Sequence, residues 1–297
     1  MAPARPRGVI AATATPVDAA FGPDLPRLLR HCRALLDGGC DAINLLGTTG
    51  EATSFGVEQR LLVMQAIASN GLPLRRFMVG TGVCSLEETT TLTRAACAMG
   101  FAGSLVLPPF FYPGLQSEGL IAYVDTLIAR VDHPALALYL YHIPQNTKVA
   151  WPVEVVAELQ RRHPSVLAGL KDSAGDLAYA KEVVRAVPGI DVFPSSEASL
   201  ANAAADGFAG CISATVNLTS ALSQTGWSGQ GTPEGAAAIA KAGALRAALA
   251  SQPLVASVKA ALALLYDDPE WKRLCPPLQA LNEAQARALQ AALAAIA

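Results

Sequence analysis

Short apolar runs alternate with longer segments of helical periodicity along most of the chain. In the first long segment Leu25, Leu28 and Leu29 begin one apolar stripe, which Pro23 opens and Gly38 closes. Strands are expected at residues 8–15, 41–46, 77–81, 103–107, 136–141, 166–171, 190–194 and 210–214. Helices are expected at residues 23–38, 57–68, 86–99, 120–131, 152–162, 177–187 and 200–206.

This alternation predicts one α/β fold class, the (β/α)8 TIM barrel. Strict strand–helix alternation requires parallel strands with right-handed crossovers, and eight such units in ~250 residues close naturally into a barrel. An open doubly wound sheet would carry a glycine-rich phosphate turn after its first strand, and residues 13–21 do not form one. We therefore expect a barrel domain at residues 1–225.

The last part of the chain, residues 226–297, is predicted to be a C-terminal helical extension. It is rich in alanine, and prolines at positions 253, 276 and 277 mark breaks between helices. Leucines at positions 245, 249, 262 and 265 are spaced as in packed helices.

Composition narrows the class of protein. The chain is 52% hydrophobic with a formal net charge of -2, so neither a nucleic-acid partner nor a membrane partner is expected. Its six scattered cysteines contain no C-x-x-C pair and are typical of a reduced, cytoplasmic protein. Residues 1–8 show no secretory signal, and no apolar run reaches membrane-spanning length. No His, Asp or Glu pair has metal-ligand spacing, so no metal is expected.

The run from Val166 to Asp176 draws attention because a buried strand ends in Lys171. An amine withdrawn from water loses proton affinity, since desolvation disfavours its charged form. Such an amine can attack a ketone and form a Schiff base. The alternative is a lysine that only extends its amine to solvent at a strand end.

Polar groups gather at the predicted carboxyl ends of the other strands, where the active site of such a barrel lies. They comprise Thr48, Thr49, Tyr112, Tyr141, His142, Ser195, Ser196, Glu197 and Ser213, with the aromatic residues Phe110 and Phe111 beside Tyr112. The pattern suggests one shared cavity. Several have plainer interpretations. The Gly47–Glu51 segment can be a capped turn or an anion-binding turn, the aromatic run can pack against another subunit, and His142 can be structural.

Three motifs carry a resemblance to a known family. The segments Gly47–Glu51, Tyr141–Pro144 and Gly169–Ser173 resemble those of the dihydrodipicolinate synthase/N-acetylneuraminate lyase family of class I aldolases. The resemblance implies a barrel with C-terminal helices, a homotetramer and no cofactor. It implies that Lys171 forms the Schiff base with pyruvate or another 2-oxo acid, and that Tyr141 moves the proton.

The same resemblance assigns the remaining contacts. It implies that Thr48 and Thr49 hold the keto acid carboxylate, with Thr48 also positioning the Tyr141 hydroxyl. The residues that it places near the bound keto acid are Gly47, Ile212 and Ser213.

Three departures from the family pattern bear on the substrate. Asn146 stands where dihydrodipicolinate synthases have a carboxylate-binding arginine, and Phe111 stands where they have a tyrosine that completes a relay in the neighbouring subunit. Tyr112 is the candidate replacement. Glu197 is followed by Ala198, whereas sialic acid lyases have a second acidic residue there.

The expected reaction is therefore the cleavage or formation of a 2-keto-3-deoxy sugar acid or a related 4-hydroxy-2-oxo acid, with pyruvate and an aldehyde as partners. The residues expected to bind the substrate hydroxyls are Gln145, Asn146, Ser195, Ser196 and Glu197. The alternatives are a dehydratase acting on the same acids, a dihydrodipicolinate synthase, a non-catalytic keto acid binding barrel, and a phosphate-binding barrel.

Overall fold

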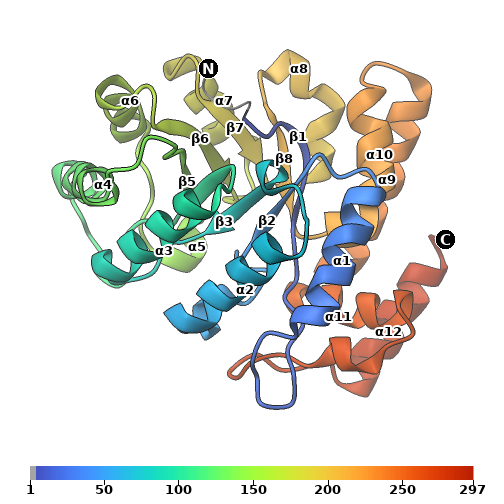
Figure 1. Ribbon diagram of the computed structural model, residues 1–297. Helices are drawn as coiled ribbons and strands as arrows, with labels where there is room; N and C mark the ends of the chain where they lie inside the picture. Colours follow the sequence, from blue (N-terminus) through green and yellow to red (C-terminus); the bar gives the residue numbers. More distant parts are fainter. Residues whose placement is uncertain (1–4, 297) are drawn as a thin grey trace.

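The computed structural model describes residues 5–296 and contains eight parallel strands in the order β7-β6-β5-β4-β3-β2-β1-β8. This is the predicted TIM barrel (Figure 1). The strands are β1 (Gly8–Ala12), β2 (Ala42–Leu45), β3 (Phe77–Gly80), β4 (Gly103–Val106), β5 (Leu138–His142), β6 (Leu167–Asp172), β7 (Asp191–Pro194) and β8 (Gly210–Ser213). Between β7 and β8 the barrel is joined by the Ala209 amide, which donates to the Val192 carbonyl at 2.9 Å.

Helices cover the outside of the strands, as the alternation predicts (Figure 1). They are α1 (Leu25–Asp37), α2 (Val57–Ser69), α3 (Leu86–Met99), α4 (Ser117–Val131), α6 (Val153–Arg162), α7 (Leu177–Ala186) and α8 (Ala203–Asp206). The short helix α5 (Pro144–Thr147) instead follows β5 directly at its carboxyl end. Local chemistry sets several ends. The Asp24, Ser85 and Asp176 side chains accept backbone N–H bonds at the starts of α1, α3 and α7. Gly100 ends α3 in the left-handed conformation, with φ of 92°.

Two predicted elements differ from the structure in extent. The first strand ends at Ala12 rather than residue 15, because the Ala14 amide turns to the Asn217 side chain at 3.1 Å. The segment predicted as a helix at 200–206 begins as a 3-10 helix, η3 (Glu197–Asn202), and becomes α-helical only in α8.

The C-terminal part of the chain is helical. It contains α9 (Val216–Ser228), α10 (Pro233–Ala250), α11 (Leu254–Leu265), the 3-10 helix η4 (Pro269–Lys272) and α12 (Glu283–Ala294). Helix α9 runs across the predicted boundary at 225–226, and the division into two domains stays a prediction. Leu249 and Leu262 are fully buried, whereas Leu265 is 60% exposed. Among the described residues no single helix is long and apolar enough to cross a membrane, and α10 and α11 pass that test only as a pair bent by 113°.

The barrel interior is filled by side chains, so the lumen is a packed core rather than a pore. They include Met78, Leu105, Tyr139 and Phe193. Two glycines let Tyr139 lie across neighbouring strands, because a Cβ at Gly103 or Gly169 would approach its ring to 2.5 Å. The candidate site lies above this packed layer, at the carboxyl ends of the strands.

Candidate active site

Lys171 lies inside the barrel near the carboxyl end of β6, and the whole strand is buried. The residue is 4% exposed. Strands β5 and β6 pair in a register that sets Lys171 beside Tyr141. The Lys171 Nζ lies 4.4 Å from the centre of the Tyr141 ring. An amine and a phenol therefore share one water-poor position, so Lys171 does not simply extend its amine to solvent.

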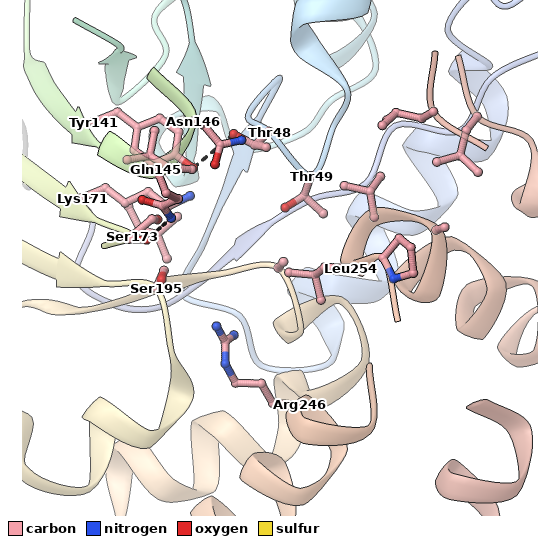
Figure 2. Close-up of a pocket in the computed structure, with 18 of the residues that line it drawn as sticks. Thr48, Thr49, Tyr141, Gln145, Asn146, Lys171, Ser173, Ser195, Arg246 and Leu254 are labelled. Carbon is pink, nitrogen blue, oxygen red and sulfur yellow. Dashed lines mark hydrogen bonds between the residues drawn. The ribbon is translucent and has the colours of Figure 1, made fainter. Parts of the chain in front are cut away.

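The Tyr141 hydroxyl lies at the meeting point of three polar side chains. It is 3.2 Å from Thr48 Oγ1, an interaction drawn as a dashed line in Figure 2. Burial raises the pKa of Tyr141, but the charge of Lys171 and the hydrogen bonds with Thr48 and Ser173 outweigh burial, and the pKa lies below its ordinary value of 10.0. A phenol with a lowered pKa gives up its proton more readily, which suits a group that must donate and accept protons in turn.

The loop that carries Thr48 is held in an unusual backbone conformation. It follows β2, and the residues that flank it, Leu46 and Glu51, have positive φ angles of 53° and 54°. Gly80 lets it pass close by, because a Cβ there would lie 2.0 Å from the Leu46 carbonyl oxygen. The Glu51 amide donates to the Thr48 carbonyl at 3.1 Å and closes the turn.

The same loop is anchored from the C-terminal side of the molecule. The Glu51 carboxylate forms an ion pair with Lys259 of α11, and both side chains are fully buried. It also accepts the Cys275 amide at 2.7 Å, while the Lys259 amine donates to the Arg273 carbonyl at 2.7 Å. The position of the threonines thus depends on the helices that follow the barrel.

A cavity of about 590 Å³ opens above Lys171 and Tyr141 (Figure 2). Strand ends form one side and C-terminal segments form the other. The barrel side comprises Thr48, Thr49, Tyr141, Ile143, Gln145, Asn146, Lys171, Ser173, Ser195, Ile212 and Ala214. The C-terminal side comprises Arg246, Pro253, Leu254, Val255, Ala256, Leu274, Pro277, Leu278 and Gln279. A chamber of this size accommodates a molecule considerably larger than a three-carbon keto acid.

A second cavity of about 300 Å³ shares Thr48, Tyr141, Ile143 and Asn146 with the first. Gly47 lines this second cavity. Its lining also includes Arg60, which is 1% exposed. Burial lowers the pKa of Arg60 to about 10.

Comparison with known proteins identifies the family. A sequence model of the dihydrodipicolinate synthetase family matches residues 5–296. The chain belongs to this family. An uncharacterized DapA-like lyase of Chloroflexus aurantiacus is 35% identical over 292 residues, which cover 97% of this chain and 96% of the relative. The family consists of class I aldolase-type lyases, and the chain is an enzyme of that class.

Solved structures of the family superpose over nearly the whole chain. A dihydrodipicolinate synthase from Agrobacterium tumefaciens has a TM-score of 0.89 and 25% identity, covering 97% of this chain and 99% of the other. YagE of E. coli K12, solved in complex with pyruvate, has a TM-score of 0.88 and 22% identity, covering 98% of each chain. At 22% identity, the likeness to YagE is evidence for the shared fold alone.

The structure brings most of the residues expected from the family resemblance to the cavity. Thr48, Thr49, Tyr141, Lys171 and Ile212 line it together, and so do Asn146 and Ser195. Ser196 instead caps η3 by accepting the Ala198 amide at 3.3 Å. It does not line the cavity.

Glu197 and Ser213 lie behind the cavity wall, and neither is exposed. The Glu197 carboxylate accepts hydrogen bonds from the hydroxyls of Ser213 at 3.0 Å, of Thr219 at 2.8 Å, and of Thr215. A side chain committed in this way orients its neighbours and does not reach a substrate in the cavity.

The two aromatic residues after β4 lie elsewhere. Phe111 is 74% exposed and Tyr112 is 65% exposed, with ring centroids 5.6 Å apart. Neither lines the cavity described above, and Phe110 lines only the second cavity. His142 is buried against Tyr179 at a centroid distance of 3.9 Å and accepts the Trp151 amide, which is a structural role.

Several lining residues were not expected from the sequence. Ser173 follows Lys171 by two positions and hydrogen-bonds to the Tyr141 hydroxyl. It belongs to the Gly169–Ser173 motif, so the sequence could have marked it as a site residue. Arg246 and the apolar residues 253–256 come from the C-terminal helices, and no local pattern marks them as part of the site. Among the described residues there is no group of three or more His, Cys, Asp and Glu side chains that could hold a metal ion.

Proposed function

We propose that this chain is a class I aldolase that cleaves or forms a 2-keto-3-deoxy sugar acid, or a related 4-hydroxy-2-oxo acid, through a Schiff base on Lys171. One observation carries the proposal. The buried Lys171 Nζ lies 4.4 Å from the Tyr141 ring centre, and the Tyr141 hydroxyl lies 3.2 Å from Thr48. A nucleophile, a proton carrier and a hydroxyl that positions the carrier therefore lie together at one end of a large cavity.

In the cleavage direction the Lys171 amine attacks the keto carbon, and loss of water gives a protonated imine. Tyr141 supplies the proton for that water and becomes a phenolate. The phenolate then takes the proton of the C4 hydroxyl, the C3–C4 bond breaks, and C4 leaves as an aldehyde. The electron pair of that bond moves toward the imine and leaves an enamine. Protonation at C3 and addition of water release pyruvate and restore the amine. Thr48 and Thr49 bind the carboxylate of the keto acid.

The cavity wall supports a polyhydroxy acid rather than the second substrate of a dihydrodipicolinate synthase. Asn146 lines the wall at the position where those enzymes have an arginine, and an amide hydrogen-bonds to hydroxyl groups without supplying a charge. Gln145 and Ser195 add further neutral donors and acceptors on the same side of the cavity. Pyruvate as the keto acid is supported by YagE, which was solved with pyruvate.

Borohydride trapping tests the proposal. Reduction in the presence of pyruvate should add the mass of one reduced pyruvate unit to the peptide that contains Lys171, and Lys171→Ala should lose both the adduct and the cleavage of 2-keto-3-deoxy acids. Lys181→Ala is the matched control, because Lys181 is an exposed residue of α7 paired with Asp206. An adduct on another lysine, or turnover that survives Lys171→Ala, contradicts the proposal.

The assembly is proposed to be a homotetramer. The neighbouring side chains of Phe111 and Tyr112 support contact with another copy, because large aromatic groups exposed to this degree are typical of interfaces. Sedimentation equilibrium should give four times the chain mass, and Phe111→Ser should shift the distribution toward smaller species. A monomer at micromolar concentration contradicts the expectation.

A further inference from the structure

Within the described part of the chain, Arg246 is the one cationic side chain that the C-terminal helices contribute to the wall of the first cavity. It projects from α10 toward the cavity, on the far side of Ser195 from Lys171 in Figure 2. Its side chain is 27% exposed, so it is partly withdrawn from water without being enclosed. The proposed chemistry at Lys171 does not use it.

One nitrogen of this guanidinium is fixed from behind. Arg246 Nη1 donates to Ser213 Oγ and to Thr215 Oγ1, both at 3.1 Å. Those two hydroxyls in turn donate to Glu197. The direct distance from Arg246 Nη1 to Glu197 Oε2 is 3.4 Å, which is long for a charge-assisted hydrogen bond. The hydroxyls therefore orient Arg246, and the buried Glu197 carboxylate forms an ion pair with the same nitrogen.

The other edge of the guanidinium is available. No hydrogen bond among the described residues engages Arg246 Nε or Nη2, while all its bonds run through Nη1. These two nitrogens form a fork whose geometry matches the two oxygens of a carboxylate. A side chain held at one edge and open at the other is preorganised to bind such a group.

The charges of the cavity favour an anion at this edge. Among the described residues its lining includes Lys171 and Arg246 but no Asp or Glu, and the one carboxylate paired with Arg246, that of Glu197, is fully buried behind the wall. Pro253, Leu254 and Val255 form part of the same side of the cavity. Apolar neighbours lower the local dielectric and strengthen an interaction between a guanidinium and a carboxylate.

We propose that Arg246 determines substrate specificity by binding a second carboxylate, at the end of the substrate away from the ketone. The preferred substrate is then a hydroxy-2-oxo diacid, and the aldehyde released with pyruvate carries a carboxylate of its own. This inference rests on the proposed aldolase function. Arg246 acts in binding, and the bond-breaking step at Lys171 and Tyr141 is the one described above.

Two substrates that differ only at the distal end test the proposal. One is a 2-keto-3-deoxyhexarate, which ends in a carboxylate, and the other is the 2-keto-3-deoxyhexonate of the same configuration, which ends in a hydroxymethyl group. The wild-type protein should have the higher kcat/KM for the diacid. Arg246→Gln should lower that kcat/KM by roughly 10- to 100-fold, mainly through KM, as expected for loss of one charge-assisted contact. The kcat/KM for the monoacid should change much less.

Two further variants separate recognition from folding. Arg246→Lys keeps the charge but loses the fork, so its preference for the diacid should lie between those of the wild type and Arg246→Gln. Arg185→Gln, at an exposed position of α7, should retain the wild-type preference. Thermal unfolding of each variant shows whether the fold is intact. If Arg246→Gln does not fold, Arg246→Lys alone tests the role of Arg246. A preference for the diacid equal to that of the wild type in Arg246→Lys then overturns the proposal.

The outcomes also separate this proposal from the aldolase function. If pyruvate is trapped on Lys171 but the two substrates react equally well, or Arg246→Gln affects both alike, the role of Arg246 is wrong and the aldolase function stands. If pyruvate is not trapped on Lys171, the aldolase function fails, and the proposal for Arg246 fails with it.

Discussion

The chemistry proposed for this protein depends on how a few side chains change each other's properties. Lys171 lowers the pKa of Tyr141 against the effect of burial, and Thr48 fixes the direction in which the phenol points. Tyr139 is on the same strand, yet burial raises its pKa, and its hydroxyl has no hydrogen-bond partner among the described residues. The pKa values of two tyrosines two positions apart on β5 are therefore shifted in opposite directions.

The tyrosine pair provides a matched test. Tyr141→Phe should lower kcat for pyruvate release by about 10²- to 10⁴-fold, the range for loss of a general acid–base group. Tyr139→Phe makes the same chemical change and should leave kcat near the wild-type value, because it removes a hydroxyl that forms no hydrogen bond. Comparable losses in both variants would mean that the effect of Tyr141→Phe comes from packing of the barrel core.

A buried histidine makes stability depend on pH. Burial lowers the pKa of His31 from 6.5 to about 4, although its hydrogen bond to Asn217 opposes the shift. Between pH 6.5 and 4 the unfolded chain takes up a proton that the folded chain does not, so the free energy of unfolding decreases as the pH falls. The contribution of His31 across this window is about 3 kcal/mol.

Urea unfolding at pH 7 and pH 4.5 measures this effect. His31→Gln should show a smaller loss of stability between the two pH values than the wild type, even if the variant is less stable at both. His142, whose pKa burial also lowers to about 4, remains in the variant, so part of the pH dependence should persist. Identical pH dependence in the two proteins would show that His31 does not contribute.

At the scale of elements, the loop after β2 and helix α11 form one unit. Glu51 and Lys259 are 208 positions apart and form a fully buried ion pair, so breaking it leaves a charge in a water-free site. The loop that this pair holds carries Thr48 and Thr49. The stability of the C-terminal helices and the geometry of the keto acid site are therefore coupled.

Removing one partner of this pair should be costly. Glu51→Gln should lower the free energy of unfolding by about 3–5 kcal/mol, since it leaves Lys259 without its counter-ion. It should also raise the KM for the keto acid. Glu58→Gln, at an exposed position in the first turn of α2, is the control. Combining Glu51→Gln with Lys259→Met should cost less than the sum of the two single changes. Simple additivity in urea unfolding contradicts the coupling.

The elements could be predicted from the sequence because their signals are local, and the family resemblance singled out the side chains at the strand ends. Helix α3 has the predicted bounds, since Ser85 caps its start and Gly100 ends it. Lys171 and Tyr141 lie near the ends of apolar strands and Thr48 follows one, and parallel strands bring their carboxyl ends together. Arg246 could not be predicted in the same way, because its position depends on how α10 packs against the barrel. Glu197 was expected to bind substrate hydroxyls, but the hydroxyls of Ser213 on β8 and Thr219 on α9 hold its carboxylate inside the wall. Those contacts also depend on how distant elements pack, so the sequence does not show them.

At the scale of the whole molecule, the cavity is composite. The barrel supplies the amine, the phenol and the threonines, whereas α10, α11 and the segment after η4 supply the opposite side. If Arg246 selects the substrate, the reacting end is fixed by strands and the selective end by helices. Changes in the helices can then alter the aldehyde partner without disturbing the Schiff base.

The junction between β7 and β8 has a consequence for how the barrel opens. Every other neighbouring pair of strands forms a ladder, but across this junction the Ala209 amide reaches the Val192 carbonyl from just before β8. We expect deuterium to replace the Ala209 amide hydrogen faster than the amide hydrogens of β1, which has a ladder on both sides. Equal protection, measured by NMR, would contradict this. If β7 and β8 separate transiently, Ser195 and Ile212, which lie on opposite sides of the junction, move apart. A ligand that contacts both residues should therefore slow hydrogen exchange at the Ala209 amide.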